Sequence, residues 1–153
     1  YYIAQNLIDF WFRVVWKNYP KFETREVEFS ETDVRNYVGR KYEALVEQFI
    51  PALLPFKVRS IGKYWGKYPG KEKGKESFEV DILAVGDRDI ALVEVKWSEM
   101  STKDIQKEIE KMKKIADAIK DNREKHIVLV AKRASKKMDN VYDLRTLEKI
   151  MRV

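Results

Sequence analysis

Apolar residues recur at intervals of three and four positions along the first stretch of the chain. This spacing is typical of a helix with one apolar face and predicts a helix over residues 3–18, ended by Asn18 and Pro20. Aromatic surfaces of this size are seldom left in water, so we expect this helix to pack into a core or to dock onto a further domain. Its apolar positions are Ile3, Leu7, Phe10, Trp11, Val14 and Val15.

The same spacing returns in a second segment and predicts a helix over residues 33–50. Ser30 or Thr32 is its expected cap, and Pro51 and Pro55 are expected to close it. The apolar face of this helix consists of Val34, Val38, Tyr42, Leu45, Val46 and Phe49.

Shorter apolar runs rich in β-branched and aromatic residues follow, and they predict strands over 56–65, 77–85 and 90–97. The last two strands are separated only by the turn at residues 86–89, whose Gly-Asp pair is a strong turn signal. So short a connection predicts an antiparallel hairpin.

Helical spacing then resumes after Ser101, which forms the capping pattern Ser-x-x-Asp with Asp104. The apolar face of this helix runs to Ile119, and a strand is predicted at residues 126–131. Because a strand that follows a crossover helix pairs in parallel with an earlier strand of its sheet, the sheet should be mixed. A short closing helix is predicted over residues 141–151.

The predicted fold class is α/β, with a mixed four-stranded sheet flanked by helices and an extra N-terminal helix. A chain of 153 residues matches one domain by length. We divide residues 1–153 into an N-terminal helix and connector (1–30), an αβββαβ core (31–132) and a C-terminal tail or helix (133–153).

The composition excludes several kinds of chemistry. The chain has no cysteine, which rules out disulfides, thiolate metal sites and a cysteine nucleophile and fits a reducing cytoplasm. A single histidine leaves no multi-histidine metal site and makes a Ser-His-Asp triad a poor expectation. The many lysines and glutamates are typical of proteins from thermophiles. The most apolar stretch is shorter than the roughly 20 residues of a membrane span, and no signal peptide is evident.

Positive charge is concentrated between Lys57 and Lys75, where seven basic residues stand against one acid. Aromatic side chains lie among them, and such a mixture can follow a phosphate backbone while bases stack on the rings. The alternative is a solvated lysine-rich hairpin. The candidate nucleic-acid-binding residues are Lys63, Tyr64, Trp65, Lys67 and Lys71.

Charged residues also stand inside predicted strands, where apolar residues are expected. Asp81 lies within an apolar run, and a buried carboxylate needs a cation, a proton or water. Glu94 and Lys96 end the next strand, and strand alternation places both on one face. Glu94-Val95-Lys96 is the only Glu-x-Lys in the chain, and Asp-x-Lys does not occur.

The hairpin would therefore present two carboxylates to one point, as Mg²⁺ or Mn²⁺ requires, with Lys96 beside them. Glu43, at the edge of the apolar face of the second helix, could supply a third ligand. Such a site can polarise a phosphodiester and activate water. The alternative is a rim carboxylate at Glu43 and a surface ion pair between Glu94 and Lys96.

These residues resemble the PD-(D/E)xK nuclease superfamily: an acid on a helix, an acid on one hairpin strand and Glu-x-Lys on the next. A broader likeness, over roughly residues 1–97, is to the carboxy-terminal domain of a predominantly archaeal ATPase family. It is carried by Phe10-Trp11-Phe12-Arg13, Tyr37-Val38-Gly39-Arg40-Lys41-Tyr42-Glu43, Ile61-Gly62-Lys63-Tyr64-Trp65-Gly66, Glu79-Val80-Asp81-Ile82 and Glu94-Val95-Lys96-Trp97.

The resemblance implies a restriction-endonuclease-like fold and a catalytic set of Glu43, Asp81, Glu94 and Lys96, with the three acids holding the metal. It also implies an upstream ATPase module, so we expect the chain to be a piece of a longer polypeptide. It lacks the glycine-rich loop that binds ATP, and a valine replaces the superfamily's proline before Asp81.

The leading hypothesis is therefore a Mg²⁺-dependent nuclease that acts on DNA. Two alternatives stay open: a catalytically silent module that binds DNA or regulates the ATPase, and a protein-interaction domain. The sequence does not decide between DNA and RNA or between a monomer and a homo-oligomer.

Overall fold

The computed structural model describes residues 5–24, 30–69 and 77–152. The chain forms two compact units, residues 1–42 and 43–153. Helix α3 (Glu31–Leu53) contributes to both units, and each unit is described by itself.

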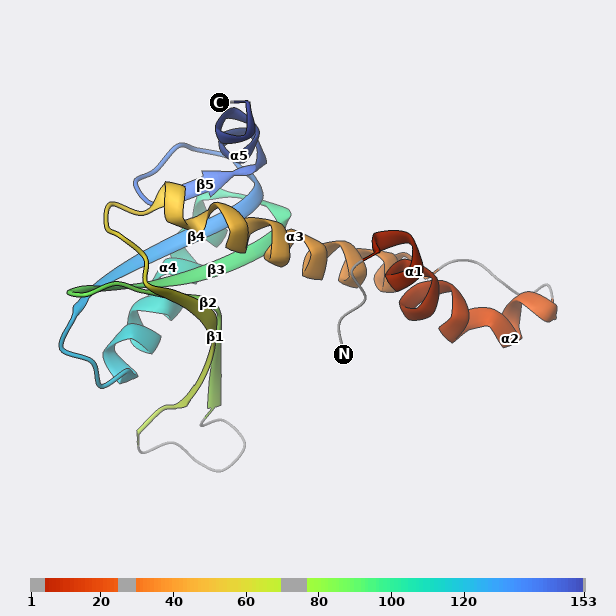
Figure 1. Ribbon diagram of the computed structural model, residues 1–153, viewed down its shortest axis with the longest axis horizontal. Helices are drawn as coiled ribbons and strands as arrows, with labels where there is room; N and C mark the ends of the chain where they lie inside the picture. Colours follow the sequence, from red (N-terminus) through yellow and green to blue (C-terminus); the bar gives the residue numbers. More distant parts are fainter. Residues whose placement is uncertain (1–4, 25–29, 70–76, 153) are drawn as a thin grey trace. The chain divides into compact units, whose positions relative to one another are not determined.

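The larger unit is a mixed α/β structure built on an open five-stranded sheet with strand order β1-β2-β3-β4-β5 (Figure 1). The first two pairings are antiparallel and the last two are parallel. The hairpin and the parallel crossover are thus as predicted, but the prediction of four strands is wrong. The strands are β1 (Ser60–Lys67), β2 (Ser77–Val85), β3 (Asp89–Met100), β4 (Glu124–Ala134) and β5 (Val141–Asp143).

Helix α4 (Thr102–Ala118) connects β3 to β4 and covers one face of the sheet. The predicted capping pattern is confirmed, because Ser101 and Asp104 each bond to the other's backbone N–H. The helix packs against two apolar clusters on the sheet. One cluster includes Leu92 and Met112, and the other includes Ile105 and Leu129.

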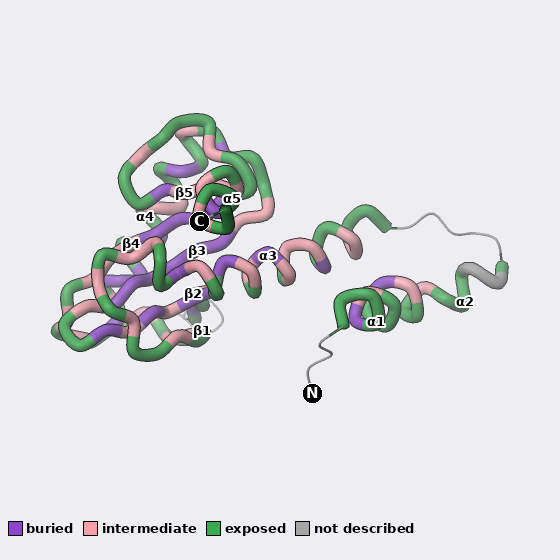
Figure 2. The backbone as a smooth tube through the Cα atoms, turned by 45° about the horizontal axis from the view of Figure 1, so that its top comes forward, coloured by how far each residue is buried: buried purple, intermediate pink, exposed green. Residues whose placement is uncertain are grey.

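Both faces of the central strand are covered, since residues 90–95 of β3 are all buried (Figure 2). The end of α3 that belongs to this unit contains Val46 and Ile50, both fully buried. Contrary to the prediction, Pro51 lies inside this helix. The helix continues to Leu53, whose carbonyl accepts a hydrogen bond from the Tyr142 hydroxyl at 3.3 Å.

The fifth strand occupies residues that were predicted as the start of the closing helix. Residues 141–143 pair with Leu129–Ala131, and the helix α5 (Leu144–Met151) begins only after them. Asp143 explains this boundary, because its carboxylate accepts a hydrogen bond from the Thr146 N–H and caps the helix. The buried Leu147 then anchors α5.

The first strand also starts later than predicted, at Ser60 rather than Phe56. Its pairing with β2 begins at Ser60↔Val85. Phe56 and Lys57, which precede β1, lie close to the β2–β3 turn at Gly86. A side-chain carbon at Gly86 would meet Phe56 Cδ2 at 2.7 Å and the Lys57 carbonyl at 3.1 Å, so only a glycine leaves room for this approach. The chain thus passes over the hairpin turn before it enters the sheet.

The smaller unit is helical, but its helix differs from the predicted one. It consists of α1 (Asn6–Phe10), a π-helical segment η1 (Trp11–Trp16) and α2 (Lys17–Glu23). The helix passes through Asn18, whose side-chain amide donates to the Val14 carbonyl at 2.7 Å, and through Pro20.

Only part of the expected apolar face of these helices is buried: Val14 is 1% exposed, but other predicted positions are not buried. Leu7 is 80% exposed and Trp11 is exposed, whereas Asp9 is only 5% exposed. The Asp9 carboxylate is held by Arg13 at 2.6 Å and Lys41 at 2.8 Å, which compensates its burial. Ile3 lies outside the described residues.

Among the residues that the structure describes, no helix combines the length and the apolar character that a membrane crossing requires.

Candidate functional site

Asp81 lies at an irregularity in the sheet. Gly62 pairs with Leu83 and Tyr64 pairs with Val80, so two residues of β2, Asp81 and Ile82, stand opposite the single residue Lys63. This is a β-bulge, a feature that redirects side chains and interrupts pairing. The regular pairing of β2 with β3 likewise ends at Ile82↔Val93.

The carboxylate of Asp81 replaces the missing ladder contact. Its Oδ2 atom accepts a hydrogen bond from the Val95 backbone N–H at 2.9 Å. The bulge and this bond place Asp81 where the pairing of β2 with β3 ends, close to the part of β3 that carries Glu94 and Lys96.

Glu94 is a buried carboxylate held by two lysines. Its side chain is 5% exposed, and its Oε1 atom accepts hydrogen bonds from Lys96 Nζ at 2.6 Å and Lys111 Nζ at 2.9 Å. The contact with Lys96 was predicted from alternation along β3. Lys111 was not predicted: it lies on α4 among many other lysines, and nothing in the sequence distinguishes it from them.

Glu43, midway along α3, forms the third part of the cluster. Its Oε2 atom accepts a hydrogen bond from Lys63 Nζ at 3.1 Å, and Lys63 also lies 3.6 Å from Glu79. The charges of Glu43 and Glu94 both act on Asp81. The structure therefore brings together the four predicted catalytic residues, Glu43, Asp81, Glu94 and Lys96, with Lys63 and Lys111 added.

The two strand carboxylates have opposite protonation behaviour. Burial raises the pKa of Asp81 to about 6; the charges of Glu94 and Glu43 also raise it, while the Val95 hydrogen bond and Lys96 lower it. Burial also acts to raise the pKa of Glu94, but the hydrogen bonds from Lys96 and Lys111 outweigh it and leave the pKa of Glu94 lowered. Near pH 6 Glu94 is thus ionised, whereas Asp81 readily takes up a proton or a cation.

The donor atoms of the cluster suit a hard divalent cation. Each carboxylate has one oxygen that accepts no hydrogen bond in the described part of the chain: Asp81 Oδ1, Glu94 Oε2 and Glu43 Oε1. Every buried side-chain oxygen described by the structure has a hydrogen-bond partner, so these three atoms must be in contact with solvent. Mg²⁺ and Mn²⁺ prefer carboxylate oxygens. No choice of one oxygen from each of the three carboxylates places all three oxygens within 4.8 Å of one another. The side chains would therefore have to rotate to close around an ion.

The candidate nucleic-acid-binding residues take different positions. Lys63 is engaged with the acids of the cluster, and Tyr64 packs against Phe78 at the edge of the core with ring centres 6.2 Å apart. Trp65 is 65% exposed, and Lys67 is exposed. Lys71 lies outside the described residues.

A groove of about 680 Å³ adjoins the cluster through Lys111. Three lysines of α4 line it, Lys107, Lys111 and Lys114, together with Tyr68, Pro69 and Ala118 and the acids Glu110 and Asp117. Lys111 also bonds to Glu94, so this one lysine connects the groove with the buried carboxylate.

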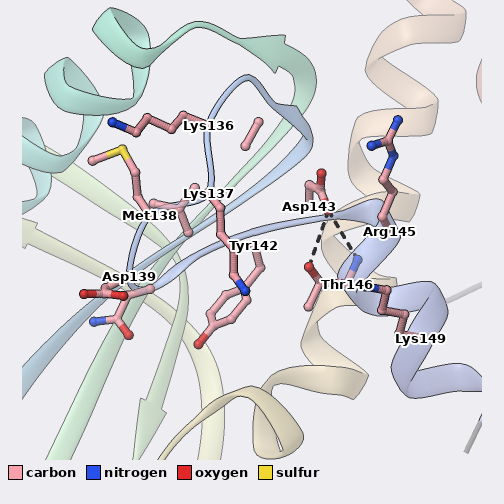
Figure 3. A pocket seen from close by; sticks show the side chains of 12 residues that line it. Lys136, Lys137, Met138, Asp139, Tyr142, Asp143, Arg145, Thr146 and Lys149 are labelled. Atoms are coloured by element: carbon pink, nitrogen blue, oxygen red, sulfur yellow. Dashed lines mark hydrogen bonds between the residues drawn. The ribbon is translucent and has the colours of Figure 1, made fainter.

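A second groove, of about 760 Å³, lies between the β4–β5 connection and α5 (Figure 3). Lys136, Lys137, Arg145 and Lys149 surround it, and none of the cluster residues lines it. Asp143 turns toward Thr146 there as the α5 cap.

The fold and the cluster together define a mixed α/β protein with a lysine-held carboxylate site at the point where two strands separate. It belongs to the family DUF234, described as "Archaea bacterial proteins of unknown function", which it matches over residues 11–109. Of the predicted relationship to a predominantly archaeal ATPase family, the match confirms the coarser part, a family of archaeal and bacterial proteins.

The chain is also similar to the "Uncharacterized protein MJECL04" of Methanocaldococcus jannaschii. The two are 29% identical over 149 residues, which cover 90% of this chain and 31% of the relative. The chain thus spans about a third of the length of this relative. No solved structure matches the chain.

Proposed function

We propose that this chain is a metal-dependent nuclease of the PD-(D/E)xK type that hydrolyses DNA phosphodiester bonds. The observation that supports it most is the convergence of Asp81 and Glu94 where β2 and β3 separate, with Lys96 bonded to Glu94. Glu43 adds a third carboxylate from a helix, as the resemblance to this superfamily implies.

We assign the three carboxylates of the cluster to metal binding. Asp81, Glu94 and Glu43 would hold Mg²⁺ or Mn²⁺, which supplies charge stabilisation at the phosphate and a more acidic bound water. Asp81 is well suited to bind a cation, because the neighbouring carboxylates that raise its pKa also increase its attraction for positive charge.

Lys96 would act on the attacking water. Its ammonium group is held by Glu94 but keeps 34% of its side-chain surface exposed, so it can still reach a substrate oxygen. A fixed ammonium near the reacting phosphate orients the water and stabilises the negative charge that develops in the transition state. Lys111, which donates to the same Glu94 oxygen, would contact the phosphate backbone.

The substrate would approach along the α4 groove. Its lysines can contact phosphates, and the Tyr68 ring and the exposed Trp65 offer surfaces on which bases stack. Contacts of this kind read backbone charge rather than base edges, so we expect little sequence specificity.

Cleavage of supercoiled and linear DNA in Mg²⁺ or Mn²⁺ tests this proposal. Lys96→Met should lower the rate by about 100-fold or more, in the range typical of a lost charge-stabilising group. The matched control is Lys113→Met, because Lys113 is an exposed lysine of α4 with no hydrogen bond or ion pair in the described part of the chain. Equal rates in both variants would contradict the assignment.

A second candidate function is a catalytically silent module that binds DNA or regulates an attached ATPase. It is favoured by the double pairing of Glu94, because two lysines already neutralise the carboxylate that should hold the metal. Metal binding and DNA binding without cleavage would select this alternative. The ATPase partner itself is proposed from the resemblance, since the M. jannaschii relative continues well beyond the matched region.

A further inference from the structure

A second set of metal-ligating side chains lies at the other end of the sheet, away from the carboxylate cluster. One ligand atom each from Asp89, Glu124 and His126 lies within 4.8 Å of the other two. No other group of three such residues meets this condition in the described ranges. We propose that these three residues form a binding site for a divalent transition-metal ion, with zinc as the representative ion.

Strand register builds this site. β3 and β4 are parallel neighbours in which Asp89 pairs with Glu124 and Ala91 pairs with His126. Side chains two residues apart along a strand lie on one face, so Glu124 and His126 point to the same side as Asp89. The Glu124 N–H donates to the Arg88 carbonyl at 2.9 Å, which fixes the start of this pairing.

The residue between Glu124 and His126 on β4 confirms that these two side chains lie on the same face of the sheet. Lys125 lies on the opposite face, where its ammonium donates to the carbonyls of Ala116 and Ile119 at the end of α4, both at 2.7 Å. Its neighbours on the strand, Glu124 and His126, therefore face away from α4. Glu94, by contrast, lies on the α4 side, where it bonds to Lys111. Glu94 is also five positions along β3 from Asp89, or about 17 Å, so the two sites are independent.

The imidazole is already oriented toward the acids. His126 Nε2 lies 2.8 Å from Asp89 Oδ1, and the Phe56 ring packs against the imidazole with ring centres 5.3 Å apart. Both Asp89 and His126 are partly buried. These contacts restrict the ring, so little conformational freedom is lost when a metal binds.

The two carboxylates are not engaged by basic side chains. No lysine or arginine nitrogen lies within 4.0 Å of Asp89 or Glu124 in the part of the chain that the structure describes, although the whole chain has 31 such residues. The nearby arginines bond elsewhere: Arg59 to Asp87, and Arg123 to Asp121 and the Gly86 carbonyl. This distinguishes the site from Glu94, whose carboxylate two lysines already hold.

The donor set selects the kind of ion. One imidazole nitrogen and two carboxylate oxygens suit zinc and other borderline divalent ions better than Mg²⁺, which prefers oxygen ligands alone. Zinc bound at about 2.1 Å from each atom would hold the ligand atoms roughly 3.4 Å apart. His126 Nε2 and Asp89 Oδ1, now 2.8 Å apart, would separate slightly, and the three atoms would stay within their present limit of 4.8 Å. A fourth position would stay open to water or to another ligand.

The test uses the fact that His126 is the only histidine in the chain. Its ring signals in an NMR spectrum therefore report on this site alone. We expect Zn²⁺ to shift these signals with a stoichiometry of one ion, both in the unmodified chain and in Asp81→Asn, which disrupts the carboxylate cluster but not this site. If the ring signals do not respond to excess Zn²⁺, the proposal is wrong.

Substitution of the Glu124 carboxylate provides a second test of the zinc site. Glu124→Gln should weaken Zn²⁺ binding at the imidazole by at least roughly tenfold, the scale on which loss of even a ligand's hydrogen-bond partner weakens metal sites. The matched control is Glu148→Gln, an exposed glutamate on α5, which should leave the affinity unchanged. Equal affinities in both variants would mean that the histidine binds zinc without the proposed partners.

Discussion

The Val95 backbone N–H donates a hydrogen bond to the side chain of Asp81, at 2.9 Å, at the point where the regular pairing of β2 with β3 ends. The sheet thereby keeps its backbone donor satisfied while the two strands separate. A carboxylate in a position of this kind is fixed in place and remains open to a further ligand on its other oxygen.

Asp81→Asn should stabilise the protein at neutral pH. Because burial raises the pKa of Asp81 to about 6, ionisation of this group favours unfolding as pH rises from its ordinary value of 3.8 through 6. An asparagine can still accept the Val95 hydrogen bond without carrying a charge. The gain should be on the order of 1 kcal/mol, since the group keeps partial access to water, or about 2–4 °C in Tm.

Thermal unfolding at pH 8 and pH 4 measures this effect. The Tm difference between Asp81→Asn and the unmodified chain should be positive at pH 8 and should vanish near pH 4. Asp117→Asn, at an exposed aspartate of α4, is the control and should show no such change. A destabilised Asp81→Asn at pH 8 would mean that the charged form of Asp81 is needed by the fold.

Lys111→Met should weaken the fold at neutral pH, an effect opposite in sign to that of Asp81→Asn. The substitution removes one of the two ammonium groups that lower the pKa of Glu94 against its burial. The stability that Glu94 contributes is present above its ordinary value of 4.5 and is lost as pH falls. Because Lys111 is partly exposed, we expect a loss of about 0.5 kcal/mol at pH 7.

Urea unfolding of Lys111→Met and of the control Lys113→Met measures this loss. The two midpoints should differ at pH 7 and converge only as pH falls below 4.5 through the lowered pKa of Glu94. A Lys111→Met midpoint that matches the control at pH 7 would show that the Lys111–Glu94 contact contributes nothing to stability.

Two glycines of β1 provide an internal comparison of packing. A side-chain carbon at Gly66 would lie 2.8 Å from Phe78 Cε2 and closer still to Cζ, in a ring that is itself buried, whereas Gly62 has no atom within 4 Å of that position. Gly66→Ala should therefore cost about 1–3 kcal/mol, because the core must rearrange. Gly62→Ala should be neutral or stabilising by up to about 1 kcal/mol. Chemical denaturation of both variants decides the point, and equal effects would contradict the described packing of Phe78.

DNA binding should depend on the lysines of the α4 groove. In the double variant Lys107→Met with Lys114→Met, the slope of log affinity against log salt should fall by roughly 2, because each phosphate contact contributes about 0.9. The matched control is Lys136→Met with Lys137→Met in the other basic groove, beside α5. If the control lowers the slope and the α4 variant does not, the DNA path lies on the α5 side of the molecule.

Local signals explain which parts of the fold could be predicted. The β2–β3 hairpin follows from alternation on both sides of a short turn, and the start of α4 follows from the Ser101–Asp104 capping pattern. Strand β5 could not be predicted in the same way. It has three residues, and its pairing with Leu129–Ala131 depends on contacts that its own sequence does not specify.

The candidate site shows the same division. Alternation along β3 correctly placed Glu94 beside Lys96, since that relationship is local. The bulge at Asp81 and Ile82 depends on the register with β1, and the contact of Lys111 with Glu94 depends on how α4 packs. The grouping of Asp89, Glu124 and His126 likewise requires the parallel register of β3 and β4.

The central claim is that Asp81 belongs to a metal-dependent phosphodiesterase site. Its most direct test is the initial rate at which supercoiled DNA is nicked in Mg²⁺ by the unmodified chain and by Asp81→Asn. Nicking that requires the metal and falls by about 100-fold or more in Asp81→Asn, while that variant stays folded, is the result we predict. Equal nicking by both proteins, or none by the unmodified chain with Mg²⁺ or Mn²⁺, would contradict the claim.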